Sequence, residues 1–191
     1  MRADELPILP FASATAWEAW LQREHANASG VWLKIAKRGS GIATVTYAEA
    51  LDVALCFGWI DGQKRAFDAS WFLQRFTPRK RGSRWSKINT EHAKRLIAEG
   101  RMRAAGLAQV EAARADGRWD AAYAGQASAI VPDDLRAALD ENPSAAAFFA
   151  TLRGANRYAI LYRVQDAKRP ETRAGRIARF VAMLERGETL H

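Results

Sequence analysis

The chain has 191 residues, of which 49% are hydrophobic and 26% charged, and its formal net charge is +8. These values are ordinary for a globular protein with one well-buried core and argue against wholesale disorder. No stretch approaches the roughly 18–20 apolar residues that a bilayer-spanning helix requires, so we expect no membrane span. The N-terminal sequence MRADELPILPF combines acids with prolines, unlike a secretory signal, and a cytoplasmic location is therefore expected.

The positive charge is concentrated in one part of the chain. Residues 1–58 carry a net charge of −1, residues 59–103 carry +8, and residues 104–191 carry +1. A general excess of arginine would act along the whole chain, so it does not explain this segregation. Residues 59–103 are therefore the segment in which we expect an anionic partner to bind.

The first predicted elements are a helix and a strand. Thr15 and Glu18 form a capping-box pattern, and the apolar residues that follow at helical spacing predict a helix over 15–26. The sequence VWLKIAK at 31–37 is rich in β-branched residues and is flanked by glycines, which predicts a strand.

A second helix and a hairpin come next. Thr46 and Glu49 repeat the capping box, and the helix that they start is predicted to end at Gly58. Residues 59–67 and 70–78 then predict two antiparallel strands joined by a tight turn.

From Thr90 onward the pattern is helical almost throughout. Glycines stand where the helices should end and prolines where they should begin. The predicted helices cover residues 90–99, 103–115, 132–140, 143–152, 156–167 and 170–186.

Together these elements predict the α+β class. We expect a small sheet of about three strands, partly antiparallel and packed against helices, followed by a mostly helical C-terminal half. Periodicity is weak over residues 117–130. This segment predicts a boundary between an α+β body at 1–117 and a helical region at 118–191, although the two could form one continuous domain.

The sequence motifs lie in and beside residues 58–89, GWIDGQKRAFDASWFLQRFTPRKRGSRWSKIN. They occupy Ala54–Gly62, Arg75–Lys80, and the set Ser83, Trp85, Ser86 and Asn89. Their order and spacing resemble the YdeI/OmpD-associated, or bacteriocin-protection, family. The resemblance extends to GVWLKIAKR at 30–38, to Leu96, Gly100, Met102 and Gly106, and to RPETRAGRIARFVAMLERG at 169–187.

The resemblance implies a role in protection from bacteriocins or antimicrobial peptides, with a link to envelope stress. It implies no reaction, no cofactor and no catalytic residue. The site therefore has to be derived from the chemistry of the segment itself.

The loop between Pro78 and Asn89 is a candidate for anion binding. It carries the cations Arg79, Lys80, Arg81, Arg84 and Lys87. Hydroxyl groups, backbone amides and the N-terminus of the next helix also suit a phosphate or carboxylate. Trp85 and Trp71 would stack on a base, unless Trp85 is folded into the core and the loop is only a solvated basic turn.

The hairpin strands leave two questions open. One face of residues 71–76 carries Trp71, Leu73 and Arg75, and the other carries Phe72, Gln74 and Phe76, so either set could be core. Asp61 beside the sheet requires a partner, for which Lys64, Arg65 and Arg75 are candidates, or else it contacts a ligand.

Three functions are consistent with these observations. The leading hypothesis is a small cytoplasmic binding protein for an anionic partner, namely single-stranded nucleic acid, a nucleotide or a phosphorylated metabolite. Its predicted binding residues are Trp59, Asp61, Arg75, Arg79, Lys80, Arg81, Arg84, Trp85, Ser86 and Asn89. The second hypothesis is a protein–protein module of a stress response, in which an acidic protein binds the same surface. The oligomeric state stays open.

The third hypothesis is an enzyme with a site near Asp61, Arg79 and Ser86, because a carboxylate close to arginines suits acid–base chemistry. No catalytic residue is predicted, however. The three histidines show no metal spacing, and Cys56, expected to be buried, is the only cysteine. We therefore expect neither a metal nor a cofactor.

Overall fold

The computed structural model describes residues 6–126 and 129–191. The chain divides into two compact units, Met1–Ala122 and Tyr123–His191. The boundary lies at 122–123, against 117–118 in the sequence analysis.

The first unit contains a mixed sheet of four strands. These are β1 (Ile8–Pro10), β2 (Val31–Ala36), β3 (Trp59–Ala66) and β4 (Trp71–Pro78), in the order β1-β2-β4-β3. β1 is parallel to β2, and the other neighbours are antiparallel. The α+β class is confirmed, but the estimate of about three strands missed β1. A three-residue segment that ends in proline carries little strand signal and forms by pairing with its neighbour.

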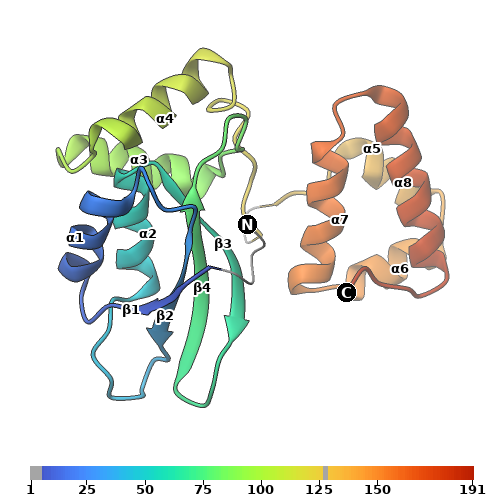
Figure 1. Ribbon diagram of the computed structural model, residues 1–191. Helices are drawn as coiled ribbons and strands as arrows, with labels where there is room; N and C mark the ends of the chain where they lie inside the picture. The colour runs from blue at the N-terminus through green and yellow to red at the C-terminus, as the bar shows by residue number, and fades with distance from the viewer. Residues whose placement is uncertain (1–5, 127–128) are drawn as a thin grey trace. The chain divides into compact units, whose positions relative to one another are not determined.

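The helices of this unit are α1 (Ala14–Glu24), α2 (Tyr47–Cys56), α3 (Lys87–Ala98) and α4 (Ala104–Ala115). Figure 1 shows α1 and α2 against one side of the sheet. The core on that side contains Val31, Leu33 and Ile35 of β2 and Phe76 of β4. The open question about β4 is thereby answered, because Phe76 and its face of the strand belong to the core.

The helix caps confirm one sequence prediction and correct another. Thr46 and Glu49 form the predicted capping box at the start of α2, and the hydrogen bond from the Thr46 backbone holds the pKa of Glu49 below its ordinary value. The box predicted at Thr15 is wrong. Ser13 caps α1 instead, because its side chain accepts the amide hydrogen of Ala16 at 3.2 Å.

Helices α2 and α4 approach each other very closely at Gly106. A Cβ atom at this position would lie 2.3 Å from the carbonyl oxygen of Cys56 and 2.7 Å from that of Leu55. The same Cys56 carbonyl accepts a hydrogen bond from the backbone amide of Arg103 at 3.0 Å. Glycine is therefore required where α4 passes the end of α2.

The second unit is helical in its described part. It contains α5 (Asp133–Asp140), α6 (Pro143–Thr151), α7 (Gly154–Asp166) and α8 (Pro170–Glu185), which confirms the four helices predicted there. Their core includes Leu135, Ile160, Phe180 and Leu184. None of the helices in the described ranges of either unit is long and apolar enough to cross a membrane.

Candidate functional site

The candidate site lies on the side of the sheet opposite the α1–α2 core. Strand alternation and register place Trp32 and Lys34 of β2, Arg65 of β3, and Trp71, Leu73 and Arg75 of β4 on this side. We call these six residues the outer face of the sheet. β4 lies between β2 and β3, and its Leu73 pairs with both Lys34 and Arg65.

Cations on this face lie over aromatic rings. The guanidinium of Arg65 is 4.1 Å from the ring centroid of Trp32. The ammonium of Lys34 is 4.4 Å from the ring centroid of Phe67 and 4.6 Å from that of Trp71. These distances are within the range of attractive cation–π contacts, so charge and flat apolar surface occur together.

The rings differ in how far solvent reaches them. Trp32 is 2% exposed, whereas Phe67, in the hairpin turn, is 46% exposed. Trp71 is half-buried, and Arg65 is exposed. The aliphatic parts of long cationic side chains can cover apolar surface while their charged ends remain in water. Phe67 and Trp71 are consequently the rings that a ligand could reach.

A β-bulge shapes the neighbouring part of β3. The register shifts between Asp61 and Lys64, and the buried side chain of Gln74 donates hydrogen bonds to the carbonyls of Gly62 (2.9 Å) and Gln63 (3.3 Å). A Cβ atom at Gly62 would lie 3.0 Å from Nε of Arg75. The absence of a side chain at Gly62 therefore leaves room for the Arg75 guanidinium beside β3.

In the basic loop, residues 79–86, the aromatic ring and the cation stacked on it are buried, unlike the accessible rings near the hairpin turn. Trp85 is 2% exposed, and its ring lies 5.0 Å from that of Trp119. Arg79 is 6% exposed, stacks 3.6 Å over the Trp85 ring and donates a hydrogen bond to the Arg84 carbonyl at 3.1 Å. Trp85 is therefore folded into the core, as in the second alternative considered for it. Lys80 and Arg81 are exposed.

Four other residues predicted to bind a ligand have structural partners. Trp59 is buried and donates from Nε1 to the His25 carbonyl at 3.1 Å. Asp61 accepts a hydrogen bond from the Tyr47 hydroxyl at 2.8 Å, a structural partner other than the basic candidates Lys64, Arg65 and Arg75. Ser86 caps α3 by accepting the Asn89 amide hydrogen at 3.1 Å. Trp59, Asp61 and Ser86 thus have side-chain partners within the first unit, whereas the Asn89 contact is made by its backbone amide.

A partly exposed charge cluster between α2 and α3 was missed in the sequence. His92 Nδ1 lies 2.7 Å from one carboxylate oxygen of Asp52, and Arg95 donates to the other at 2.6 Å. Burial raises the pKa of Asp52, but the hydrogen bonds with His92 and Arg95 outweigh it, so this pKa lies below its ordinary value. Burial raises the pKa of the nearby Cys56 thiol to about 11, which leaves the thiol inert at neutral pH. The described residues form no group of three or more His, Cys, Asp or Glu that could hold a metal ion.

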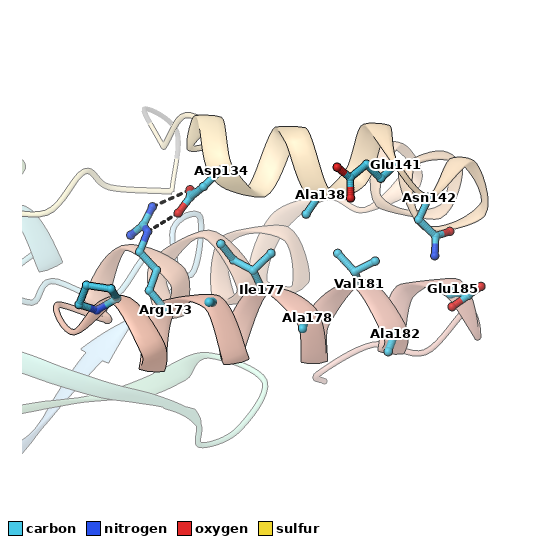
Figure 2. Close-up of a pocket in the computed structure, with 12 residues that line it drawn as sticks. Asp134, Ala138, Glu141, Asn142, Arg173, Ile177, Ala178, Val181, Ala182 and Glu185 are labelled. Atoms are coloured by element: carbon cyan, nitrogen blue, oxygen red, sulfur yellow. Dashed lines mark hydrogen bonds and ion pairs between the residues drawn. The ribbon is translucent and has the colours of Figure 1, made fainter.

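The second unit has a groove of about 710 Å³ between α5 and α8. Figure 2 shows Ile177 and Val181 of α8 beside Ala138 of α5 along this groove. Arg173 and Asp134 form an ion pair at one end, with Nη2 2.8 Å from Oδ1, and the hydrogen bond from Arg173 lowers the pKa of Asp134. Glu141 and Glu185 lie at the other end (Figure 2).

Comparison with known protein families gives separate matches for the N-terminal and C-terminal parts of the chain, in line with the two structural units. Residues 9–109, more than half of the chain, match the model of a domain of unknown function, DUF8412. Residues 128–187 match the family described as bacteriocin-protection, YdeI or OmpD-associated. Neither the curated proteins nor the solved structures include a significant match.

These matches confirm the family resemblance but change its extent. The motifs at 54–89, on which the resemblance mainly rested, lie within the DUF8412 match, whereas the segment at 169–187 lies within the bacteriocin-protection match. The chain belongs to the DUF8412 family, and its C-terminal part, residues 128–187, is similar to the bacteriocin-protection, YdeI or OmpD-associated family.

Proposed function

We propose that the first unit binds single-stranded nucleic acid along the outer face of the sheet and the adjoining hairpin turn. The observation that carries the proposal is the contact of Lys34 with Phe67 and Trp71, which places a cation beside two accessible rings. Proteins that bind single strands use this combination, because bases stack on the rings and cations neutralise the phosphates.

The accessible rings favour a single strand over a duplex. In a duplex the faces of the bases are occupied by their neighbours, whereas unpaired bases can turn outward onto an aromatic side chain. Phe67 has the most exposed ring of the hairpin, since nearly half of its surface is open to solvent. It is therefore the expected first stacking position.

The distribution of cations supports binding along the length of β4. The hairpin contributes the exposed Arg65, which pairs with Leu73, and the basic loop that follows β4 contributes the exposed Lys80 and Arg81. From Leu73 to the end of β4 at Pro78 the strand extends for about 16 Å at roughly 3.3 Å per residue. An extended strand could thus meet cations at both ends and rings near the hairpin turn. Such a partner implies that the protein acts in the cytoplasm.

The proposal can be tested by fluorescence anisotropy with short labelled single-stranded RNA and DNA over a salt series. Contacts with Lys34, Arg65, Lys80 and Arg81 would give a slope of log K against log salt of about −2.8, at roughly −0.7 per contact. Lys34→Glu/Arg65→Glu should weaken binding and flatten the slope. Phe67→Ala should weaken binding by about 1–3 kcal/mol without flattening it.

The matched control is Arg23→Glu/Lys94→Glu, which changes the net charge equally at exposed positions on α1 and α3 of the same unit. Circular dichroism verifies that each variant is folded. Equal losses of affinity in the control and in Lys34→Glu/Arg65→Glu would show that only net charge matters. Absence of binding at low salt would reject nucleic acid as the partner.

A further inference from the structure

We propose a second, independent binding site: the groove between α5 and α8 binds a cationic amphipathic helix of a partner protein or peptide. The proposal rests on the shape, apolar floor and charge of this groove. It does not depend on the nucleic-acid proposal, which concerns the other unit.

The groove has the length and surface of a helix-binding site. α8 has 16 residues and is therefore about 24 Å long. Ile177 and Val181 are four residues apart, as are Ala174, Ala178 and Ala182, and all five line the groove. Residues at this spacing form a continuous ridge on one helix face, and the alanines leave room for a second helix to pack closely. An apolar helix face would thus find a matching surface.

The charge of the groove selects a cationic occupant. Its lining contains three carboxylates, those of Asp134, Glu141 and Glu185, and one cation, Arg173. Arg173 is paired with Asp134, whereas Glu141 and Glu185 form no ion pair with another described residue. The groove therefore has a negative end on a protein whose net charge is +8. A lysine or arginine at the end of the docked helix would face these two carboxylates.

The other side of α5 provides an internal contrast. A second groove there is lined by Arg136, Asp140, Arg153 and Arg157 together with apolar residues, so its charged lining is predominantly positive. Glu141 and Asp140 are consecutive and both exposed, yet they line different grooves. The two positions thus form a matched pair for mutagenesis.

The test uses the full chain and a fluorescein-labelled peptide of about 15 leucine and lysine residues, arranged so that the leucines form one helix face over roughly 23 Å. Anisotropy should show micromolar binding to the wild type. Glu141→Lys/Glu185→Lys should raise the Kd at least about tenfold, because it reverses both charges at the groove end. Ala178→Trp should raise it by a similar factor by filling the floor, whereas Asp140→Lys should change it less than about twofold.

Three results would overturn the proposal. One is a wild-type Kd that Glu141→Lys/Glu185→Lys leaves unchanged, and another is an equal loss in Asp140→Lys, which would show unspecific attraction. The third is a wild-type dimer, seen by sedimentation equilibrium, that Ala178→Trp dissociates, since the groove would then bind a second copy of this chain. Failure of the nucleic-acid experiment would affect none of these measurements.

Discussion

The β3–β4 hairpin and the basic loop contain the same kinds of residue but use them in opposite ways. In the loop, Trp85 is buried and Arg79 is held over its ring beneath the surface. At the hairpin, Phe67 remains exposed and Lys34 lies beside it, where solvent and ligands have access.

The difference arises from where each segment meets the helices. The basic loop leads directly into α3, and Trp85 packs into the core that α3 and Trp119 share. The hairpin turn lies at the far end of β4 from this loop, and its Phe67 ring is exposed. Aromatic residues among cations thus stabilise the fold in one place and form an accessible surface in the other. Four predictions test this contrast.

The largest effect is expected for Trp85→Ala. Removal of a fully buried ring leaves a cavity and should lower the free energy of unfolding by about 3–5 kcal/mol. Phe67→Ala removes a half-exposed ring and should cost less than about 1 kcal/mol. Urea denaturation followed by circular dichroism compares the two variants, and similar losses would contradict the contrast.

Loss of the buried cation Arg79 should likewise destabilise the protein more than loss of the exposed cation Arg65. Arg79→Ala removes a buried side chain, its stacking on Trp85 and its hydrogen bond to the Arg84 carbonyl, so we expect a loss of about 2 kcal/mol. Arg65→Ala removes an exposed cation–π contact and should cost about 0.5–1 kcal/mol. If Arg65 proved the more important for stability, the hairpin cations would be structural and the proposed binding face would lose its main support.

The next largest loss of stability is expected for Asp52 of α2. Its carboxylate contacts His92 and Arg95 of α3, the helix after the basic loop. Asp52→Asn should destabilise the protein by about 1.5 kcal/mol near pH 6, because two charge-assisted contacts are weakened. The pKa of Asp52 is lowered on folding, so its contribution is present above the ordinary aspartate pKa of about 3.9 and is lost as the pH falls below that value. The difference in stability between wild type and variant should therefore shrink as the pH falls below about 4. A constant difference across this range would argue against an ionised Asp52 as the cause.

The smallest effect is expected at Ser86. Ser86→Ala removes the N-cap of α3 and should cost about 1 kcal/mol, whereas Ser86→Asp retains a capping oxygen and should cost less. Thermal denaturation can resolve this difference. If neither variant weakened nucleic-acid binding, the Ser86 side chain would be shown to act only as a cap.

The sequence predicted most of the fold because most signals are local. Helix periodicity, the Thr46 capping box and the residues that mark the ends of the hairpin strands each depend on neighbouring residues. The three-residue β1 depends on pairing with β2, and the choice of Ser13 over Thr15 as a cap depends on where the chain enters α1. Neither is specified within a short window.

The candidate site was harder to predict because it depends on strand order. Lys34 approaches Trp71 only because β2 pairs with β4, although 37 positions separate the two residues in the chain. One signal was available: in VWLKIA the apolar Val31, Leu33 and Ile35 alternate with Trp32 and Lys34. That alternation could have assigned Trp32 and Lys34 to the face opposite the core. The inward orientation of Trp85 had no such signal, because a loop has no fixed side-chain period.

The close approach of α4 to α2 at Gly106 also has a consequence for evolution. Any descendant that replaced this glycine would have to move one helix away from the other, because even a methyl group meets the Cys56 carbonyl. Among homologous sequences, a glycine at this position is therefore expected wherever the α2–α4 crossing has been inherited. A single alignment column would thus separate relatives that retain this crossing from those in which the helices have been rearranged.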